Sequence, residues 1–348
     1  MGSKARRSRF VLALVAGLAL AGVCGRAEAA SSVADFYQGK TITLIVGTSA
    51  GGTYDTTARL VARHLGRHLP GAPAVVVQSL LGAGGVNALH HLYSVAPRDG
   101  SVIGMVIRYY PLEPFLFPAG VRYDPLRFNP IGSSSSETAV AVTWHGSPVK
   151  SFNDLFKTGI TVGATGPLDD TSRFPLVARN LTGAKIRIVT GYPGGNDVTM
   201  AMERGEVDGR FGWSWGSVKS RARNWLAEKK INIIFQIGMQ KAPDLPDTPF
   251  VMDYAKTERD RQALELLFAA QTFAWPFIAP PEVPADRLDA LRRGFDATMK
   301  DRDFLADAAK LDLEIEPVSG EAMTALIKRI LSFDRSVVER AKALTADK

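Results

Sequence analysis

The sequence predicts an α/β protein made of two lobes with a ligand cleft between them. Two observations support this: strand and helix patterns alternate along most of the 348 residues, and the alternation restarts after residues 108–130, which are rich in proline and aromatic side chains. Alternating strands and helices predict a parallel sheet with helices on both faces. Without the leader described next, roughly 320 residues remain, enough for two domains of about 100–200 residues each.

Residues 1–29 are typical of a signal peptide. Basic residues in positions 4–9 precede a run of small apolar residues over 10–23, and Ala27-Glu28-Ala29 matches a cleavage site. The apolar run is short for a bilayer span of about 20 residues. We predict cleavage after Ala29 and a periplasmic protein. The alternatives are an uncleaved anchor and a lipoprotein attached at Cys24, which the bulky Val23 disfavours.

Composition narrows the range of partners. The leader holds five of the 42 Lys and Arg residues and one of the 35 Asp and Glu residues, so the rest of the chain is close to neutral. It has no dense basic stripe with interleaved aromatic residues, so we expect no nucleic-acid partner. The single cysteine lies in the leader. We therefore expect no disulfides and a fold held by its core.

The first part of the chain alternates strands and helices around glycine-rich turns. Residues 41–47 are predicted as a strand, followed by a glycine-rich break and a helix over about 54–68. Residues 74–77 form the next strand, Gly82 to Gly85 a turn, and 86–93 a helix; residues 102–107 follow as a strand. Residues 108–130 are predicted as an irregular connection.

The second part repeats this alternation. Strands are predicted over 139–144, 160–164, 185–190, 207–211, 231–237 and 273–279. Helices are predicted over 151–156, 173–181, about 197–203, 217–229 and 261–268, and from 285, 302 and 320. The pieces after 243 have no sheet of their own, so we expect them to complete the first lobe. The predicted first lobe is 30–130 plus 244–348, and 131–243 is an inserted second lobe, with two crossings between them.

Glycine-rich turns between a strand and a helix predict an anion site. A helix N-terminus leaves unpaired N–H groups and a positive dipole end, and glycine lets a ligand approach the backbone. Gly51-Gly52, Gly84-Gly85, Gly194-Gly195 and the polar loop 165–172 all follow predicted strands, and such turns gather along one edge of a sheet. Neither of the first two fits G-x-G-x-x-G, and each turn alone can be purely structural. Together they indicate capture of a small acidic solute outside the cytoplasm.

A hydrolase motif is present without its partners. Gly212-Trp213-Ser214-Trp215-Gly216 matches G-x-S-x-G, but no histidine follows His145, so the sequence argues against a serine hydrolase. We expect Trp213 to line the cleft, with Ser214 as a further candidate; the alternative is two core tryptophans. An exported hydrolase or lyase using Ser214, or the Asp169/Asp170 pair, is the competing hypothesis to a non-enzymatic receptor.

The remaining candidates have simpler explanations. His64 and His68 are spaced i, i+4 on a helix but lack the pattern of a zinc site, so we expect no metal and no cofactor. Asp169 and Asp170 precede a helix, which they are expected to cap. The alternative is that Asp169 binds an amine or hydroxyl of a ligand, with Arg173 as a countercharge.

Over essentially the whole chain after the leader, the sequence resembles the periplasmic receptors of tripartite tricarboxylate transporters, the Bug or TctC proteins. The segments that carry the resemblance are 39–46 with Ala50 to Asp55, 82–85, 96–100, 192–195 with 205–208, 245–249 and 279–285. Their order and spacing, and no single segment, make the match specific.

The resemblance implies a type II, Venus-flytrap binding protein that closes on a carboxylate and delivers it to a membrane permease. We also expect a monomer. With Trp213 from the motif analysis, the expected ligand-binding residues are Ala50, Gly51, Gly52, Thr53, Tyr54, Asp55, Gly84, Gly85, Thr165, Gly166, Asp169, Thr171, Ser172, Tyr192, Pro193, Gly194, Gly195 and Trp213. Departures from the family pattern at Thr53, 166–170 and 211–213 leave the solute's identity open.

Overall fold

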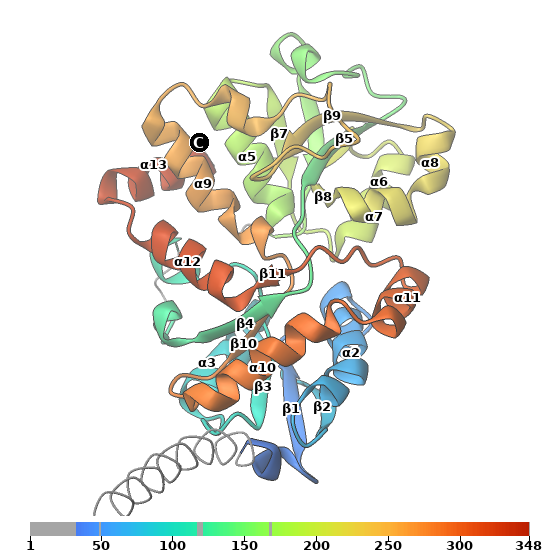
Figure 1. Ribbon diagram of the computed structural model, residues 1–348. Coiled ribbons are helices and arrows are strands. Elements are labelled where there is room, and N and C mark those ends of the chain that lie inside the picture. Colours follow the sequence, from blue (N-terminus) through green and yellow to red (C-terminus); the bar gives the residue numbers. More distant parts are fainter. Residues whose placement is uncertain (1–32, 49, 117–120, 167–168, 348) are drawn as a thin grey trace, which may run out of the picture.

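The computed structural model describes residues 33–48, 50–116, 121–166 and 169–347. They form two lobes, one above the other in Figure 1, each built on one β-sheet with helices packed against it. The α/β class predicted from the sequence is confirmed. The predicted signal peptide, including Cys24, lies outside the described residues. Within the described part of the chain, no helix is both long enough and apolar enough to span a bilayer.

Both sheets are mixed. The first sheet has the order β11-β4-β10-β3-β1-β2 and the second β7-β6-β8-β5-β9. The strands of the first sheet are β1 (Thr41–Val46), β2 (Ala74–Ser79), β3 (Val102–Met105), β4 (Asn129–Ser133), β10 (Pro276–Ala279) and β11 (Val318–Ser319). Those of the second are β5 (Ala139–Trp144), β6 (Ile160–Gly163), β7 (Ile186–Val189), β8 (Gly209–Ser214) and β9 (Ile231–Ile237).

The parallel sheet predicted from the strand–helix alternation is parallel only in part, and both lobes contain antiparallel pairs. β1 runs parallel to β2 and β3, but β10 is antiparallel to β3 and β4. In the second sheet β6 is parallel to β7 and β8, and β5 is antiparallel to β8 and β9. A parallel neighbour needs a crossover that returns the chain to the same edge. β10 instead enters from the second lobe, at the edge where β3 ends, and so runs in the opposite direction.

Helices cover both faces of each sheet. In the first lobe they are α2 (Thr53–Leu65), α3 (Val86–Ser94), α4 (Glu113–Leu116), α10 (Ala285–Thr298), α11 (Arg302–Lys310) and α12 (Gly320–Leu331). In the second they are α5 (Asp170–Thr182), α6 (Gly195–Glu203), α7 (Trp215–Arg221), α8 (Arg223–Ala227), α9 (Glu258–Thr272) and α13 (Arg335–Thr345). The 3-10 turns are η1 (Gly66–His68), η2 (Ala83–Gly85), η3 (Pro125–Arg127), η4 (Phe152–Phe156) and η5 (Val251–Tyr254).

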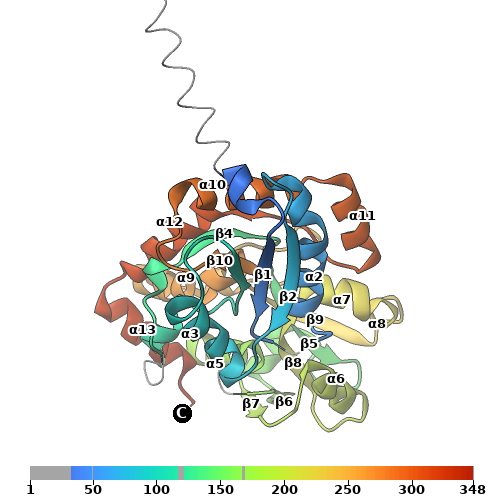
Figure 2. The ribbon, with the colours of Figure 1, turned by 90° about the horizontal axis from the view of Figure 1, so that it is seen from below.

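Alternation along β1 sends neighbouring side chains to opposite faces of the first sheet. Leu44 joins a core with α2 and α10, whereas Ile45 joins one with α3 and α12. Seen from below in Figure 2, α2 and α3 accordingly lie on opposite sides of β1. Because α2 follows β1 and α3 follows β2, the N-termini of both helices lie at the edge of the first sheet where these strands end.

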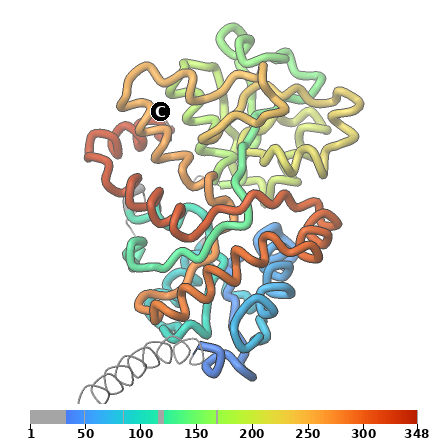
Figure 3. The backbone as a smooth tube through the Cα atoms, in the orientation of Figure 1, coloured from blue at the N-terminus to red at the C-terminus, as the bar shows by residue number. Residues whose placement is uncertain are grey.

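Two helices after residue 243 belong to the core of the second lobe, not of the first as expected. Leu264 of α9 and Leu344 of α13 share a core with Phe174 of α5, and the Phe174 and Phe268 rings meet edge to face at 5.3 Å. The chain therefore passes between the lobes three times, from β4 to β5, from α9 to β10 and from α12 to α13 (Figure 3). An apolar helix face can cover either sheet, and periodicity alone does not choose between them.

Other differences are local. The predicted helix over 217–229 is divided at Ala222 into α7 and α8, and the predicted strand 207–211 is displaced to Gly209–Ser214. The connection 108–130 contains α4 and η3, and it ends in the first residues of β4. α13 was not predicted, although its apolar residues Val337, Ala341 and Leu344 have helical spacing.

Candidate functional site

The turn before α2 leaves a helix N-terminus without a side-chain cap. Gly52 is the N-cap and makes no capping hydrogen bond, and Gly51 has a φ of +82°, a conformation that favours glycine. The first-turn N–H groups are therefore free of any side-chain cap, which is the geometry that binds anions. Thr53 and Tyr54 open this first turn, and Ala50 precedes the glycines.

Asp55 helps to maintain this turn. Its carboxylate accepts a hydrogen bond from the Gly51 N–H at 3.0 Å and pairs with Arg59 at 2.9 Å. The hydrogen bond from Arg59 is the main reason why the pKa of Asp55 lies below its ordinary value. The residue is 3% exposed. Asp55, a predicted ligand contact, thus also sets the shape of the loop.

The second glycine turn of the first lobe packs directly on the first. Gly84 and Gly85 lie in η2, before α3, and Gly85 has a φ of +99°. A Cβ at Gly47 would lie only 2.9 Å from the Cα of Gly85, and one at Gly85 would lie 2.7 Å from the Ile107 side chain. The close approach requires glycine at both positions. It brings the turns after β1 and β2 together, as predicted for strands that end at one edge.

In the second lobe, Asp169 is the N-cap of α5. Its carboxylate accepts hydrogen bonds from the Thr171 N–H at 3.0 Å and the Gly166 N–H at 3.1 Å, and also from the Thr165 hydroxyl. Burial raises its pKa above the ordinary value. Ser172, in the same turn, is buried and its hydroxyl has no partner among the described residues. Both oxygens of Asp169 are thus used inside the loop, which supports the capping role.

The neighbouring turn leads into α6. Gly194 is its N-cap and makes no side-chain capping hydrogen bond. The turn is tied to the end of β6, because the Tyr192 N–H donates to the Ala164 carbonyl at 3.3 Å. Tyr192 and Pro193 precede the glycines, and the Gly195 carbonyl accepts a hydrogen bond from Arg210 at 2.8 Å. The turns before α5 and α6 therefore lie side by side at one edge of the second sheet.

Arg108 connects the two lobes. It follows β3, and its guanidinium pairs with Glu137 in the β4–β5 connection and with Asp170 at the start of α5. Its backbone N–H donates to the Tyr54 hydroxyl at 3.2 Å. The Tyr109 hydroxyl also donates to Asp170. The first turns of α2 and α5 thus meet across this arginine, whose side chain is 12% exposed. Arg108 was not predicted as a site residue, because a single charge after a strand carries no distinctive pattern.

A cavity of about 540 Å³ lies beside this junction, between the lobes. Hydroxyl side chains that line it come from α2, the β4–β5 connection and the start of α7: Thr53, Thr57, Ser135, Thr138, Ser214 and Ser217. Of the predicted binding residues, Thr53 is the one that lines this cavity. The lysine at its rim, Lys219, pairs with Glu314 at 2.8 Å. Carboxylates also line the cavity, so its surface is polar and acidic: Glu137, Asp244, Asp312, Glu314 and Glu316.

The G-x-S-x-G segment has structural contacts. The Ser214 hydroxyl caps α7 and accepts from the Ser217 N–H at 3.4 Å. Trp213 is buried and meets Trp225 edge to face at 6.2 Å, while Trp215 donates from its ring nitrogen to Asp244 at 2.7 Å. Both tryptophans belong to the core of the second lobe, as in the alternative of two core tryptophans. Ser214 and Trp215 also line the cavity, whereas Trp213 does not.

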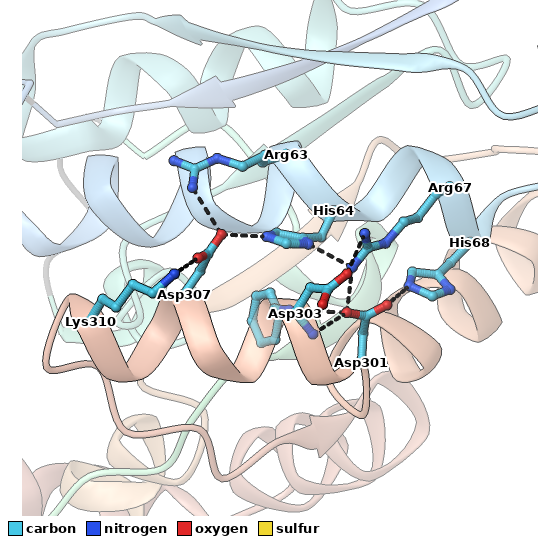
Figure 4. A network of polar contacts seen from close by, with 9 residues as sticks. Arg63, His64, Arg67, His68, Asp301, Asp303, Asp307 and Lys310 are labelled. Carbon is cyan, nitrogen blue, oxygen red and sulfur yellow. Dashed lines mark hydrogen bonds and ion pairs between the residues drawn. The ribbon is translucent and has the colours of Figure 1, made fainter.

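His64 and His68 belong to an ion-pair network that joins α2 and η1 to α11 (Figure 4). His64 meets Asp307 at 3.2 Å and His68 meets Asp301 at 2.9 Å. Arg67 also pairs with Asp301. Within the described residues, no group of three or more histidine, cysteine, aspartate or glutamate side chains is arranged to hold a metal ion.

This network predicts a stability loss in acid. The Phe304 N–H is the main reason why the pKa of Asp301 is lowered to about 2; for Asp307, also at about 2, the main reason is Lys310. An unfolded aspartate has a pKa near about 3.9, so stabilisation is complete above that pH and is lost as the pH falls toward 2. Asp301→Asn should therefore lower the unfolding temperature at pH 7, and the difference from the native protein should shrink in acid.

Thermal unfolding at intervals from pH 7 to pH 2.5 measures this difference. Asp303→Asn is a suitable control, because Asp303 lies on the same helix and faces Arg67 but is 78% exposed. It should change the unfolding temperature much less. A difference for Asp301→Asn that stays constant down to pH 2.5 would show that the ion pairs of Asp301 do not contribute.

Comparisons with known proteins identify the fold. No protein-family model matches the sequence. A Cupriavidus necator protein described as "UPF0065 protein in gbd 5'region" is 21% identical over 338 residues, which are 95% of this chain and 94% of that protein.

Several solved structures share the shape of this chain over most of its length. A TctC solute-binding protein from Polaromonas superposes with a TM-score of 0.67 at 16% identity, covering 88% of this chain and 98% of that one. An R. palustris protein with adipate gives 0.64 at 18% identity, covering 87% and 97%. MatC from Rhodopseudomonas palustris with bound malate gives 0.61 at 17% identity, covering 88% and 99%. The chain has the fold of these solute-binding proteins, which confirms the two-lobed fold expected from the resemblance.

Proposed function

We propose, from the fold that this chain shares with the TctC- and Bug-type solute-binding proteins, that it is a periplasmic receptor for a small organic anion. The observation that carries the proposal is the uncapped N-terminus of α2, which meets the N-terminus of α5 across Arg108 between the lobes. The first turn of α5 is already capped by Asp169, so the uncapped first turn of α2 is the one that attracts an anion. A ligand held there lies at the boundary between the lobes.

A carboxylate is the anion that we propose. Two structural relatives are described with adipate and with malate, both of which are carboxylates. The cavity beside the junction, which is lined by hydroxyl groups and carboxylates, suits the uncharged polar remainder of such a solute. By the same relationship, we propose that the receptor is monomeric, is exported by the signal peptide and delivers its solute to the membrane permease of a tripartite tricarboxylate transporter.

A receptor is favoured over an exported enzyme because the candidate catalytic groups have structural roles. Ser214 caps α7 and Asp169 caps α5. Asp170 is ion-paired with Arg108. A nucleophile needs a base within hydrogen-bonding reach, and the partner of the Ser214 hydroxyl among the described residues is a backbone N–H. We therefore propose a role in binding, without catalysis.

A thermal-shift screen of the purified protein without its leader, against a panel of carboxylates, amino acids and sugars, tests this function. A ligand at 100 times its dissociation constant should stabilise the folded protein by about 2.7 kcal/mol. Small-angle scattering should then show a smaller radius of gyration in its presence, because a ligand that touches both lobes favours the closed form. If sugars stabilise the protein and no carboxylate or amino acid does, the anion-receptor proposal is wrong.

A further inference from the structure

Arg210 is a buried cation at the ligand edge of the second lobe. It lies on β8 and is 6% exposed. One guanidinium nitrogen donates to the Gly195 carbonyl at 2.8 Å, and the guanidinium carbon lies 4.6 Å from the centre of a Trp213 ring. Its Nε has no hydrogen-bond partner among the described residues. The arginine is thus held in place but incompletely bonded.

Its charge is also uncompensated at close range. Arg108 pairs with Asp170 and Glu137, and Arg173 lies 3.6 Å from Glu113, but Arg210 forms no ion pair among the described residues. Asp169 is near enough to act on it electrostatically, yet the oxygens of Asp169 accept hydrogen bonds within their own loop. Burial lowers the pKa of Arg210 to about 10, so it remains charged at neutral pH. An unpaired buried charge is unfavourable and calls for an anion.

The first turn of α6 faces the same place. The guanidinium lies against Gly195, where a Cβ would come within 2.9 Å of its nitrogen, so a larger residue at position 195 would displace the guanidinium. The N-cap of this nine-residue helix, Gly194, makes no side-chain capping hydrogen bond. A guanidinium and an uncapped helix N-terminus therefore converge, and both favour a carboxylate.

We propose that Arg210, with the first turn of α6, binds a carboxylate group of the solute. This assignment rests on the proposed receptor function and deepens it, because the N-terminus of α2 already supplies an anion position in the first lobe. One position in each lobe selects a solute with an acidic group at both ends over one with a single acidic group. The planar guanidinium donates two parallel hydrogen bonds to a carboxylate, which a lysine cannot reproduce.

Calorimetric titration with matched acids tests the assignment. Butanoate, pentanoate and hexanoate carry one carboxylate, and succinate, glutarate and adipate are the corresponding diacids. The native protein should bind at least one diacid tenfold or more tightly than its monoacid partner. Arg210→Met should abolish this preference and Arg210→Lys should reduce it. Arg187→Met, at an exposed arginine on the neighbouring strand β7, should leave it unchanged.

Stability separates a binding role from a structural one. If Arg210 stabilises the folded protein, Arg210→Met should lower the unfolding temperature. If Arg210 binds the solute, the unfolding temperature should stay the same or rise, because an apolar side chain replaces an unpaired buried charge. Gly195→Ala keeps the charge but displaces the guanidinium, and should weaken the diacid preference in the same direction. If Arg210→Met does not fold, the diacid preference of Gly195→Ala tests whether Arg210 binds the solute.

The outcomes distinguish the two proposals. A native protein that binds neither acid series refutes the receptor for organic anions, and with it the role of Arg210. A native protein that binds monoacids and diacids equally, or an Arg210→Met protein that keeps the diacid preference, refutes the assignment of Arg210 alone. Loss of the preference together with an unchanged or raised unfolding temperature supports the assignment.

Discussion

Gly52→Val should weaken binding of a carboxylate ligand by at least 100-fold, about 2.8 kcal/mol, while the protein still folds. Gly52 has a φ of −77° and a ψ of 169°, an extended conformation that valine adopts readily. The added side chain occupies the space in front of the first-turn N–H groups of α2, which the ligand needs. Calorimetric titration measures the affinity, and circular dichroism checks the fold.

Two further variants sharpen this test. Gly52→Ser places a hydroxyl at the N-cap, where it accepts a first-turn hydrogen bond; it should stabilise the protein by a few tenths of a kcal/mol and still weaken binding. Gly146→Val changes an exposed glycine whose added Cβ meets its nearest atom, in Trp144, at an ordinary 3.7 Å, and should leave binding unchanged. Native affinity in Gly52→Val would place the anion site elsewhere.

Arg108→Met should lower the free energy of unfolding by about 3–5 kcal/mol. The variant leaves the Glu137 and Asp170 carboxylates buried side by side without their shared cation. Removing one partner of a buried ion pair costs far more than the pair contributes, because the remaining charge is desolvated and unpaired. Urea unfolding, followed by tryptophan fluorescence and by circular dichroism, measures the loss.

A matched control and a rescue make this prediction specific. Arg98→Met breaks an ion pair with Glu282 in which both side chains are about half exposed, and should cost at most about 1 kcal/mol. Adding Asp170→Asn and Glu137→Gln to Arg108→Met removes the uncompensated charges and should restore a large part of the stability. A loss below 1 kcal/mol in Arg108→Met would show that water reaches the junction.

Local sequence patterns predicted the strands well and the partners of each element poorly. The predicted strands 139–144 and 231–237 coincide with β5 and β9, because β-branched and apolar runs between turn residues identify a buried strand. The glycine turns were recognised because glycine pairs stand directly between a predicted strand and a predicted helix. By contrast, the assignment of α9 to the second lobe depends on contacts such as Phe268 with Phe174, which are distant in sequence and follow no periodicity.

The candidate site shows the same limit. Gly51, Gly85 and Gly195 were identified from the sequence, and the structure explains each by a positive φ or by a close contact. Arg108 and Arg210 were missed, because an arginine in or after a strand differs from a surface arginine only in what surrounds it. Asp55 and Asp169 were expected to contact the ligand, but a carboxylate near a glycine turn also stabilises that turn through the backbone N–H groups.

The position of α13 has a consequence for how the chain acquires its structure during synthesis. Leu344, four residues from the C-terminus, packs in the core of the second sheet together with α5 and α9. A ribosome releases the chain from its N-terminus onward. The second lobe therefore lacks part of its interior until α13 has been synthesised. Although α5 is synthesised far earlier, its apolar face has no complete core to join before that point.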